Sequence, residues 1–247
     1  MANGTRTRRL FDPSSDEPFK ISRSKMEMFL KCPRCFYLDR RLGISQVSGP
    51  AFTLNTAVDH LLKKEFDMYR SRGEPHPLMQ TFGVEAVPFQ HHSLEDWRDN
   101  RKGIQFQDKA SHFLFFGAID DIWVNADGEL HVVDYKSTSI SGTVTLEGEW
   151  KEAYKRQVEM YQWLFRQNGF PVSSTAFFVY VNGDKSKAGF DGRLEFSMQI
   201  LPHDGDDSWV AEALQEARLC LERDTLPPSH PDCEWCSYRR VAKEVEG

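Results

Sequence analysis

The spacing of apolar residues along the chain predicts its helices. In "SRSKMEMFLKCPRCFYLDRRL", residues 22–42, Met26, Phe29 and Leu30 recur at helical spacing, and a serine at the start is a favourable cap. Pro33 has no amide hydrogen to donate, so a break or kink is expected beside it. The same periodicity predicts three more helices, at 52–72, 149–168 and 206–223.

Runs rich in Val, Ile, Phe and Trp predict strands between these helices. The strongest pair, 113–124 and 130–137, flanks the turn sequence "NADGE" and predicts a hairpin. Weaker strands are expected within 82–112, at 174–181 and at 193–201, and a loop at the Pro- and Gly-rich segment 73–80. The order of elements predicts an α/β fold, a mixed sheet surrounded by helices.

Composition limits the organisation of the chain. Its 247 residues, 40% of them hydrophobic, suffice for one large domain. We expect residues 1–20, which are polar and basic, to form a disordered tail, and 21–247 to form a single domain that includes a cysteine-containing segment at 225–240. No apolar run is long enough to span a bilayer and no secretory signal begins the chain, so we expect a cytoplasmic protein without a membrane partner.

The predicted hairpin can close in two registers. A two-residue turn at "DG" sets Asp120 opposite Tyr135, whereas a three-residue loop with Gly128 in the left-handed conformation sets Asp120 opposite Asp134. We prefer the second register, because it places Asp120, Asp134 and Lys136 on one face of the hairpin.

Such a face carries like charges that need a partner. Directly opposed carboxylates destabilise a sheet by up to roughly 1 kcal/mol, and a divalent cation held between them, Mg²⁺ or Mn²⁺, would offset the repulsion. Lys136 would then lie beside the metal and hold a phosphate oxygen or a water, which is the equipment for metal-assisted hydrolysis of a phosphodiester. The simpler interpretation is a structural Asp–Lys pair, since the D-x-K pattern also occurs by chance.

The motifs that surround this face resemble those of a known family. "GAID" at 117–120 and "DYK" at 134–136 are followed by Gln157 and Tyr161, whose spacing places both on one face of a helix. In order and spacing they resemble the PD-(D/E)XK nuclease superfamily in its RecB-like branch, and the "CP…FYL" of the first predicted helix resembles the opening helix of that branch. The resemblance runs from about residue 21 to about residue 240 and implies a restriction-endonuclease-like mixed sheet.

The resemblance also implies a metal site for Mg²⁺ or Mn²⁺. Asp120 and Asp134 would bind the ion by carboxylate, Tyr135 by its backbone carbonyl, and His60, on a helix before the sheet, by its imidazole. The alternative for His60 is a packing or capping role.

The remaining roles that the resemblance implies are catalytic. Lys136 would position the attacking water, although burial lowers and neighbouring carboxylates raise the pKa of a lysine, and the sequence leaves open which effect is larger. Gln157 and Tyr161 would contact the nucleic-acid backbone or orient the site, and Tyr161 has packing as an alternative role. Asp121 should point to the opposite face of the strand.

Four of the five cysteines form two C-x-x-C pairs near opposite ends of the chain. Cys32 with Cys35 and Cys233 with Cys236 would supply four thiolates to one structural metal site, which would join the N- and C-terminal segments. Some RecB-like relatives, including AddB and CRISPR adaptation nucleases, carry a 4Fe-4S cluster, but this chain has Ala242 where their last cluster cysteine would stand. A 4Fe-4S cluster and Zn²⁺ therefore both stay open, as do unligated thiols.

The resemblance implies a metal-dependent deoxyribonuclease acting on single strands or ends in DNA repair, recombination or CRISPR-type processing, although the residues themselves do not distinguish DNA from RNA. The sequence shows no base-reading motif, so we expect no sequence specificity. The chain has no P-loop motif, so a helicase, repair or CRISPR partner protein is possible. The net charge of −6 does not exclude DNA binding, because basic residues cluster between 20 and 41, although such a cluster also suits a solvated helix face. The alternatives are a non-catalytic DNA-binding module and a metal-stapled interaction subunit of a larger complex.

Overall fold

The computed structural model describes residues 9–47, 49 and 52–247, which fall into two compact units. The terminal unit combines Met1–Pro50, Gln107–Phe115 and Trp209–Gly247, and the central unit combines Ala51–Phe106 and Phe116–Ser208. The chain passes from one unit to the other within strands β3 (Ile104–Asp108) and β4 (Phe113–Gly117).

The central unit contains a five-stranded mixed sheet. Its strands lie in the order β2-β5-β6-β7-β8, with only β6 and β7 running parallel, which confirms the predicted α/β class. The strands are β2 (Ala86–Pro88), β5 (Asp121–Asn125), β6 (Leu130–Thr138), β7 (Thr175–Gly183) and β8 (Phe196–Asp204).

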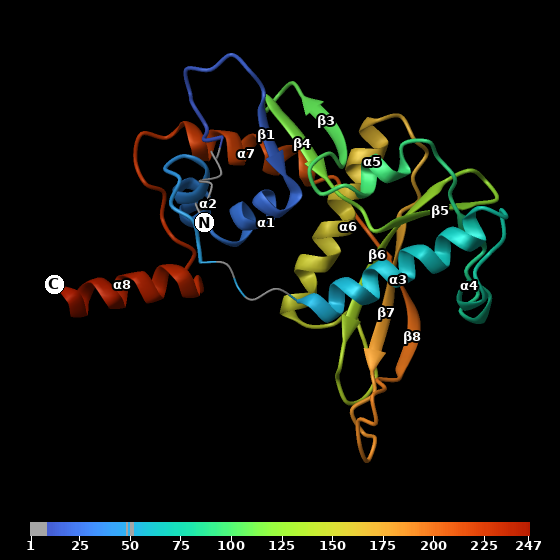
Figure 1. Cartoon of the computed structure of the whole chain (residues 1–247). Coiled ribbons are helices and arrows are strands. Elements are labelled where there is room, and N and C mark those ends of the chain that lie inside the picture. Colours follow the sequence, from blue (N-terminus) through green and yellow to red (C-terminus); the bar gives the residue numbers. More distant parts are fainter. Residues whose placement is uncertain (1–8, 48, 50–51) are drawn as a thin grey trace, which may run out of the picture. The chain divides into compact units, whose positions relative to one another are not determined.

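Two long helices of the central unit cover opposite faces of this sheet (Figure 1). On β6, Tyr135 packs against Phe66 of α3 (Thr53–Arg70), with ring centroids 5.6 Å apart. The preceding residue, Asp134, accepts a hydrogen bond of 2.7 Å from Gln157 of α6 (Glu149–Gln167). Because successive residues of a strand face opposite sides, α3 and α6 must lie on opposite faces.

The predicted strand at 113–124 is divided. Strand β4 joins β1 (Phe19–Ser22) and β3 in a separate three-stranded sheet of order β1-β4-β3, and β5 begins only at Asp121. Between the two strands, the amide of Ile119 donates to the carbonyl of Trp97 at 3.1 Å. With its amide engaged in this way, Ile119 does not continue the ladder of β4, and the chain starts a new strand, β5, two residues later.

Two short helices appear where only loop or strand was expected. The expected loop at 73–80 contains the start of α4 (Pro77–Thr81), whose proline occupies the first turn, where no amide donor is needed. The segment 82–112 includes α5 (Leu94–Arg98), which buries Leu94 and Trp97 three positions apart. Both helices are shorter than two turns, so their apolar periodicity is too brief to identify from sequence.

The terminal unit is mainly helical. The first predicted helix is divided into α1 (Arg23–Lys31) and α2 (Pro33–Arg40) by an extended Cys32, as Pro33 predicted. Helix α7 (Val210–Glu222) packs on both. The C-terminal cysteine segment leads into α8 (Glu234–Glu246), which the sequence did not predict and which has no buried residue.

The structure describes part of the segment that was expected to be a disordered tail. Of the expected tail at 1–20, residues 1–8 lie outside the described residues, but Phe11 is only 3% exposed and packs edge-on against Phe19.

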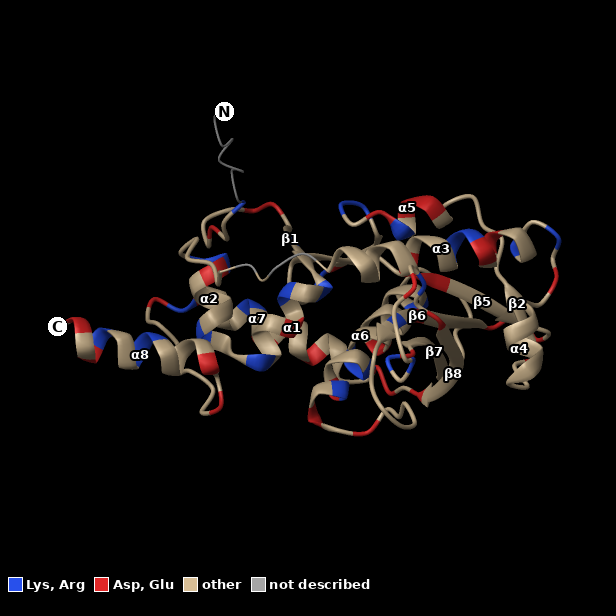
Figure 2. Ribbon diagram, turned by 60° about the horizontal axis from the view of Figure 1, so that its bottom comes forward, with Lys and Arg blue, Asp and Glu red and all other residues tan. Residues whose placement is uncertain are grey.

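The basic cluster between residues 20 and 41 is partly neutralised, because Asp39 forms ion pairs with Lys25 and Arg40 at 2.8 and 2.6 Å. Figure 2 shows both signs of charge along α8. Among the described residues, no helix has the length and apolar character needed to cross a bilayer.

Gly103 provides a test of the packing in the central unit. Its φ is +63°, and an added Cβ would lie 2.4 Å from the carbonyl oxygen of Gly117. We expect Gly103→Ala to lower the free energy of unfolding by roughly 3 kcal/mol, the sum of left-handed strain and a backbone clash, measured by urea denaturation. Gly83→Ala is the matched control, because Gly83 has φ +66° with open space around it. Equal losses in the two variants would contradict the predicted clash.

Candidate active site

The β5–β6 hairpin adopts the three-residue loop. Ile122 pairs with Val132 and Val124 with Leu130, while the amide of Asn125 donates to the Glu129 carbonyl at 3.1 Å. Gly128 has a φ of +81°, the left-handed conformation that this loop requires. The preferred register is therefore confirmed. Carried to the residue before β5, it sets Asp120 opposite Asp134.

A cavity of about 400 Å³ opens beside this pair of carboxylates, within the central unit. It is lined by residues of α3, of the segment before β5, of β6 and of the first turns of α6. The polar and aromatic lining residues are Phe52, Asn55, Thr56, Asp59, Lys63, Arg98, Asn100, Asp120, Tyr135, Lys136, Ser137 and Tyr154. Asp134 is fully buried beneath this lining.

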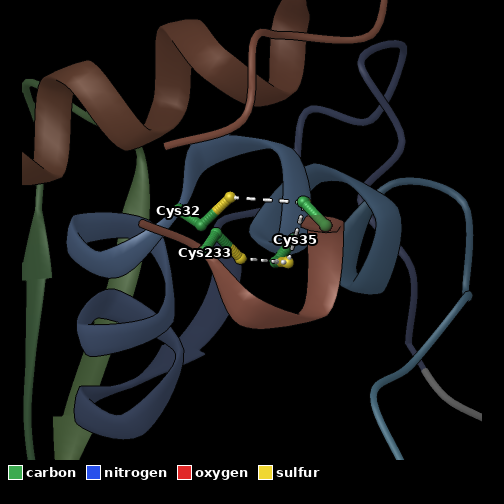
Figure 3. A group of neighbouring side chains, drawn as sticks. Cys32, Cys35 and Cys233 are labelled. Atoms are coloured by element: carbon green, nitrogen blue, oxygen red, sulfur yellow. Dashed lines mark hydrogen bonds between the residues drawn. The ribbon is translucent and has the colours of Figure 1, made fainter. Parts of the chain in front are cut away.

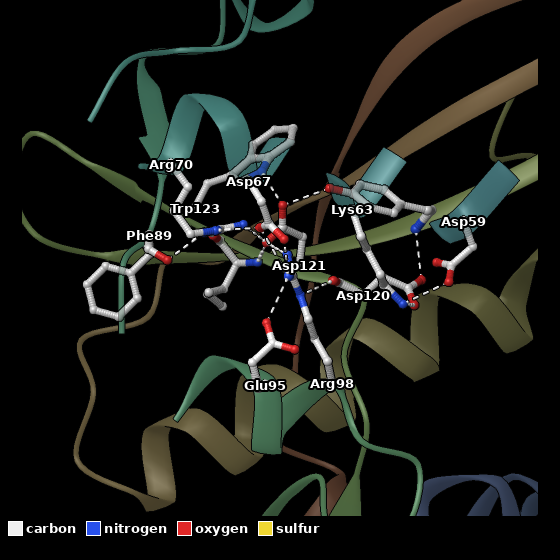
Figure 4. Close-up of polar contacts among 12 residues, drawn as sticks. Asp59, Lys63, Asp67, Arg70, Phe89, Glu95, Arg98, Asp120, Asp121 and Trp123 are labelled. Atoms are coloured by element: carbon white, nitrogen blue, oxygen red, sulfur yellow. Dashed lines mark hydrogen bonds and ion pairs between the residues drawn. The ribbon is translucent and has the colours of Figure 1, made fainter. Parts of the chain in front are cut away.

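On the α3 side of the cavity, one ammonium group bridges two carboxylates (Figure 4). The amine of Lys63 lies 2.9 Å from Oδ2 of Asp59 and 3.2 Å from Oδ1 of Asp120. Burial alone would raise the pKa of Asp120, but Lys63 and Lys136 outweigh it and hold that pKa below its usual value. Burial and the nearby Asp120 carboxylate raise the pKa of Asp59. The site therefore concentrates negative charge that cations must offset.

On the α6 side of the cavity, Lys136 forms an ion pair with Asp134. Burial disfavours the charged form of the amine, but the Asp134 and Asp120 carboxylates have the larger effect and raise the pKa of Lys136 above its usual value. This answers the question that the sequence left open. The amine also lies 4.6 Å from the centre of the Tyr154 ring, within the range of a cation–π contact.

Gln157 and Tyr161 lie behind the Asp134 carboxylate. The amide nitrogen of Gln157 donates to Oδ1 of Asp134 at 2.7 Å and lies 3.5 Å from the Tyr161 hydroxyl. Tyr161 is only 2% exposed, so its position suits orientation and packing better than contact with a nucleic-acid backbone.

His60 is not brought to the cavity. Its side chain is exposed on α3, whereas that of the preceding residue, Asp59, lines the cavity. The reason is helical geometry, since neighbouring residues of a helix point about 100° apart. Sequence reasoning missed Asp59 and Lys63, although their spacing of four residues was a visible signal of an ion pair on one helix face.

Asp121 belongs to a separate buried charge cluster, as its expected orientation implied (Figure 4). Its carboxylate forms ion pairs with Arg70 and Arg98 and accepts a hydrogen bond of 2.7 Å from the Tyr135 hydroxyl. Asp121 has no exposed surface and does not line the cavity. Tyr135 therefore contacts both aspartates: its hydroxyl donates to Asp121, and its backbone amide donates to Asp120 at 3.0 Å.

The four paired cysteines meet within the terminal unit (Figure 3). Their sulfur atoms all lie within 4.8 Å of one another, and the Cys35 sulfur is 3.6 Å from those of Cys233 and Cys236. The sulfur of Cys32 lies 3.8 Å from that of Cys236 and accepts a hydrogen bond from the His230 amide at 3.5 Å. Four thiols in this arrangement can bind a metal.

Comparison with known protein families matches residues 53–241 to the PD-(D/E)XK nuclease superfamily. The chain therefore belongs to this superfamily. No curated protein matches the chain. Among solved structures, one described as "Crystal structure of SSO0001" is similar, with 17% sequence identity and a TM-score of 0.46, and the match covers 92% of this chain and 87% of that chain.

We expect substitutions at the two adjacent aspartates, Asp120 and Asp121, to differ strongly in their effect on stability. Asp121→Asn removes the charge that two buried arginines share, so we expect the free energy of unfolding to fall by about 3 kcal/mol or more in urea denaturation. Asp120→Asn keeps an acceptor for the Tyr135 amide, so we expect a much smaller loss of stability. Comparable stabilities for the two variants would contradict the division between the cavity and the buried cluster.

Proposed function

We propose that this protein is a metal-dependent deoxyribonuclease that hydrolyses phosphodiester bonds at the cavity beside Asp120, Asp134 and Lys136. The observation that carries the proposal is the meeting of two opposed carboxylates and a lysine at one cavity, in a member of a nuclease superfamily. A chain that only held DNA through this fold would not need to keep all three groups.

The donor set of this site suits Mg²⁺ or Mn²⁺. Asp120 and Asp134 offer hard carboxylate oxygens, and the backbone carbonyl of Tyr135 directly follows Asp134 on β6. When bound, such an ion would polarise the phosphate and lower the pKa of a coordinated water. The excess of carboxylates over what Lys63 and Lys136 neutralise is the physical reason to expect a cation here.

The neighbouring side chains have distinct roles in this proposal. Lys136, whose pKa lies above its usual value and which therefore stays charged, would hold a phosphate oxygen and counter the negative charge that develops there. Gln157 would fix the Asp134 carboxylate through its hydrogen bond, and Tyr161 would support Gln157 from the buried side. Both are positioning residues. Of the two roles that the resemblance implied, contact with the nucleic-acid backbone or orientation of the site, we propose orientation.

The ligand from α3 is proposed to be Asp59. His60 was the residue expected from the resemblance, but Asp59 lines the cavity and shares Lys63 with Asp120. Exchange of the Lys63 ammonium for a metal ion would leave both carboxylates free to bind the ion.

The substrate and setting are proposed from the superfamily. Single strands or ends of DNA in the cytoplasm, during repair, recombination or CRISPR-type processing, suit a nuclease without its own motor, and a helicase could supply the strand. The alternatives are a non-catalytic DNA-binding module and an interaction subunit held together by its cysteine site.

Cleavage assays test the proposed residues. With end-labelled single- and double-stranded DNA and Mg²⁺ or Mn²⁺, we expect cleavage that EDTA abolishes. Lys136→Ala, Asp134→Ala and Asp59→Asn should each reduce the rate at least a hundredfold, because each removes charge stabilisation from the reaction. His60→Ala is the matched control on the same helix and should stay within a few-fold of the parent rate.

Two results would contradict parts of this scheme. Cleavage by folded Lys136→Ala at the parent rate would exclude the proposed active site. A large loss in His60→Ala with normal activity in Asp59→Asn would restore the histidine as the metal ligand.

For the cysteine site, we propose one tetrahedral ion, Zn²⁺, rather than a 4Fe-4S cluster. Four thiolates about 2.3 Å from a single zinc lie about 3.8 Å from one another in a tetrahedron. Three sulfur pairs lie 3.6, 3.6 and 3.8 Å apart, close to that spacing, and all four sulfurs lie within 4.8 Å of one another. In a 4Fe-4S cluster each thiolate binds a different iron, which requires wider separation of the sulfurs.

Metal analysis tests this assignment. We expect one zinc per chain by mass spectrometry and no visible absorption band. Cys233→Ser should lose the metal and lower the Tm by on the order of 10 °C, while the folded variant keeps its cleavage rate, because the cysteines and the cavity lie in different units. Cys220→Ser, at the fifth cysteine, is the control and should retain the metal. A visible iron–sulfur spectrum, or lost cleavage with normal melting, would contradict this assignment.

A further inference from the structure

Large aromatic side chains stand exposed at the mouth of the candidate active site. Phe52, directly before α3, lines the cavity and is 72% exposed. Trp150, in the first turn of α6, is 59% exposed and makes an edge contact with Tyr154, which lines the same cavity, with ring centroids 5.7 Å apart. The two exposed rings therefore belong to the two helices whose first turns border the cavity.

The structure restrains both aromatic residues without burying them. The carbonyl of Phe52 accepts hydrogen bonds of 3.1 Å from both the amide and the hydroxyl of Thr56, which ties the residue to the start of α3. The Trp150 ring has Tyr154 at one edge, and the amine of Lys151 lies 4.1 Å from its centre. The backbone of Phe52 and the ring of Trp150 are therefore already partly fixed, which lowers the entropy cost when a flat ligand stacks on these residues.

Three cationic side chains beside these rings can contact a phosphate backbone. Lys63, Arg98 and Lys136 line the cavity, where each also forms an ion pair with an aspartate. Cations that follow a backbone, next to aromatic faces on which bases stack, are the usual equipment for binding single-stranded nucleic acid. In a duplex the bases are paired and already stacked, so an aromatic ring gains contact only with unpaired bases.

We propose that Phe52 and Trp150 are substrate-positioning residues that stack on unpaired bases of a single nucleic-acid strand, and so set the preference of this site for single-stranded substrate. This inference rests on the proposed nuclease function and deepens it. The strand enters with a phosphate at Lys136, and the bases that flank this phosphate meet the two rings.

The test separates stacking on bases from attraction to phosphates. Fluorescence anisotropy in EDTA, where no cleavage occurs, measures the binding of labelled oligodeoxythymidylate, of an abasic strand of equal length, and of a duplex. We expect the parent protein to bind oligodeoxythymidylate most tightly. Phe52→Ala and Trp150→Ala should each weaken that binding on the order of tenfold and leave the affinity for the abasic strand unchanged.

Phe190→Ala is the matched control. Phe190 is also 72% exposed, but it lies between β7 and β8 and does not line the cavity, so its removal should change neither affinity. Thermal melting verifies that all three variants are folded. Trp150→Phe, which keeps a flat ring, should restore most of the affinity for oligodeoxythymidylate.

The outcomes distinguish this inference from the proposed function. Equal affinity of the parent protein for the thymidylate and abasic strands, or no binding to either, would overturn the stacking proposal. If Lys136-dependent cleavage is nonetheless present, the nuclease function stands without it. Base-dependent binding that both aromatic variants lose, with no cleavage in Mg²⁺ or Mn²⁺, would support the strand-binding surface and refute the nuclease.

Discussion

The repulsion between two carboxylates that face each other across the β5–β6 hairpin is the constraint that organises the central unit. Asp134 has no exposed surface, and Asp120 is placed opposite it by the register of the hairpin. Asp120 itself is partly exposed, with 25% of its side-chain surface accessible. Like charges of which one is buried are tolerated only where hydrogen bonds and cations surround them. The chain supplies these from both faces of the sheet, Lys63 from α3 and Gln157 from α6, with Lys136 from β6 itself. The helices that pack on the sheet therefore also supply groups that stabilise the two carboxylates of the site.

The next residue, Asp121, is a buried carboxylate whose charge is neutralised by different partners. Asp121 is enclosed by Arg70 and Arg98, two guanidinium groups that always carry charge, together with the Tyr135 hydroxyl. Its charge is fully partnered and shielded from the cavity, so it stabilises the fold. Asp120 is partnered by lysines on the cavity wall, where an exchange of cations is possible. The opposite directions of two adjacent side chains, one before β5 and one at its start, thus separate a candidate metal ligand from a structural aspartate.

In the terminal unit, the interaction that would stabilise the fold is metal binding by the four clustered cysteines. It joins α1 and α2 to the segment that leads into α8, a helix without buried residues of its own. A helix with no buried face gains little from packing, so metal ligation at its first turn is the interaction that would hold its start in place. The proposed chemistry and the proposed structural metal accordingly lie in different parts of the chain.

Local rules were enough to predict much of this protein. The apolar periodicity identified α3, α6, α7 and, as a single element, α1 with α2, although it did not identify α8. Pro33 located the break between α1 and α2. The "NADGE" turn left two hairpin registers open, and the preference for Asp120, Asp134 and Lys136 on one face selected the correct one. These features could be predicted because each of them depends on residues close together in sequence. Only the tertiary structure decided which residue of α3 reaches the cavity, since the rotation of a helix about its axis is set by distant packing partners such as Tyr135 and Trp123 on Phe66. Long-range contacts likewise separated β4 from β5, which no local pattern specifies. The meeting of cysteines about 200 residues apart is also long-range, but the two C-x-x-C motifs had predicted it.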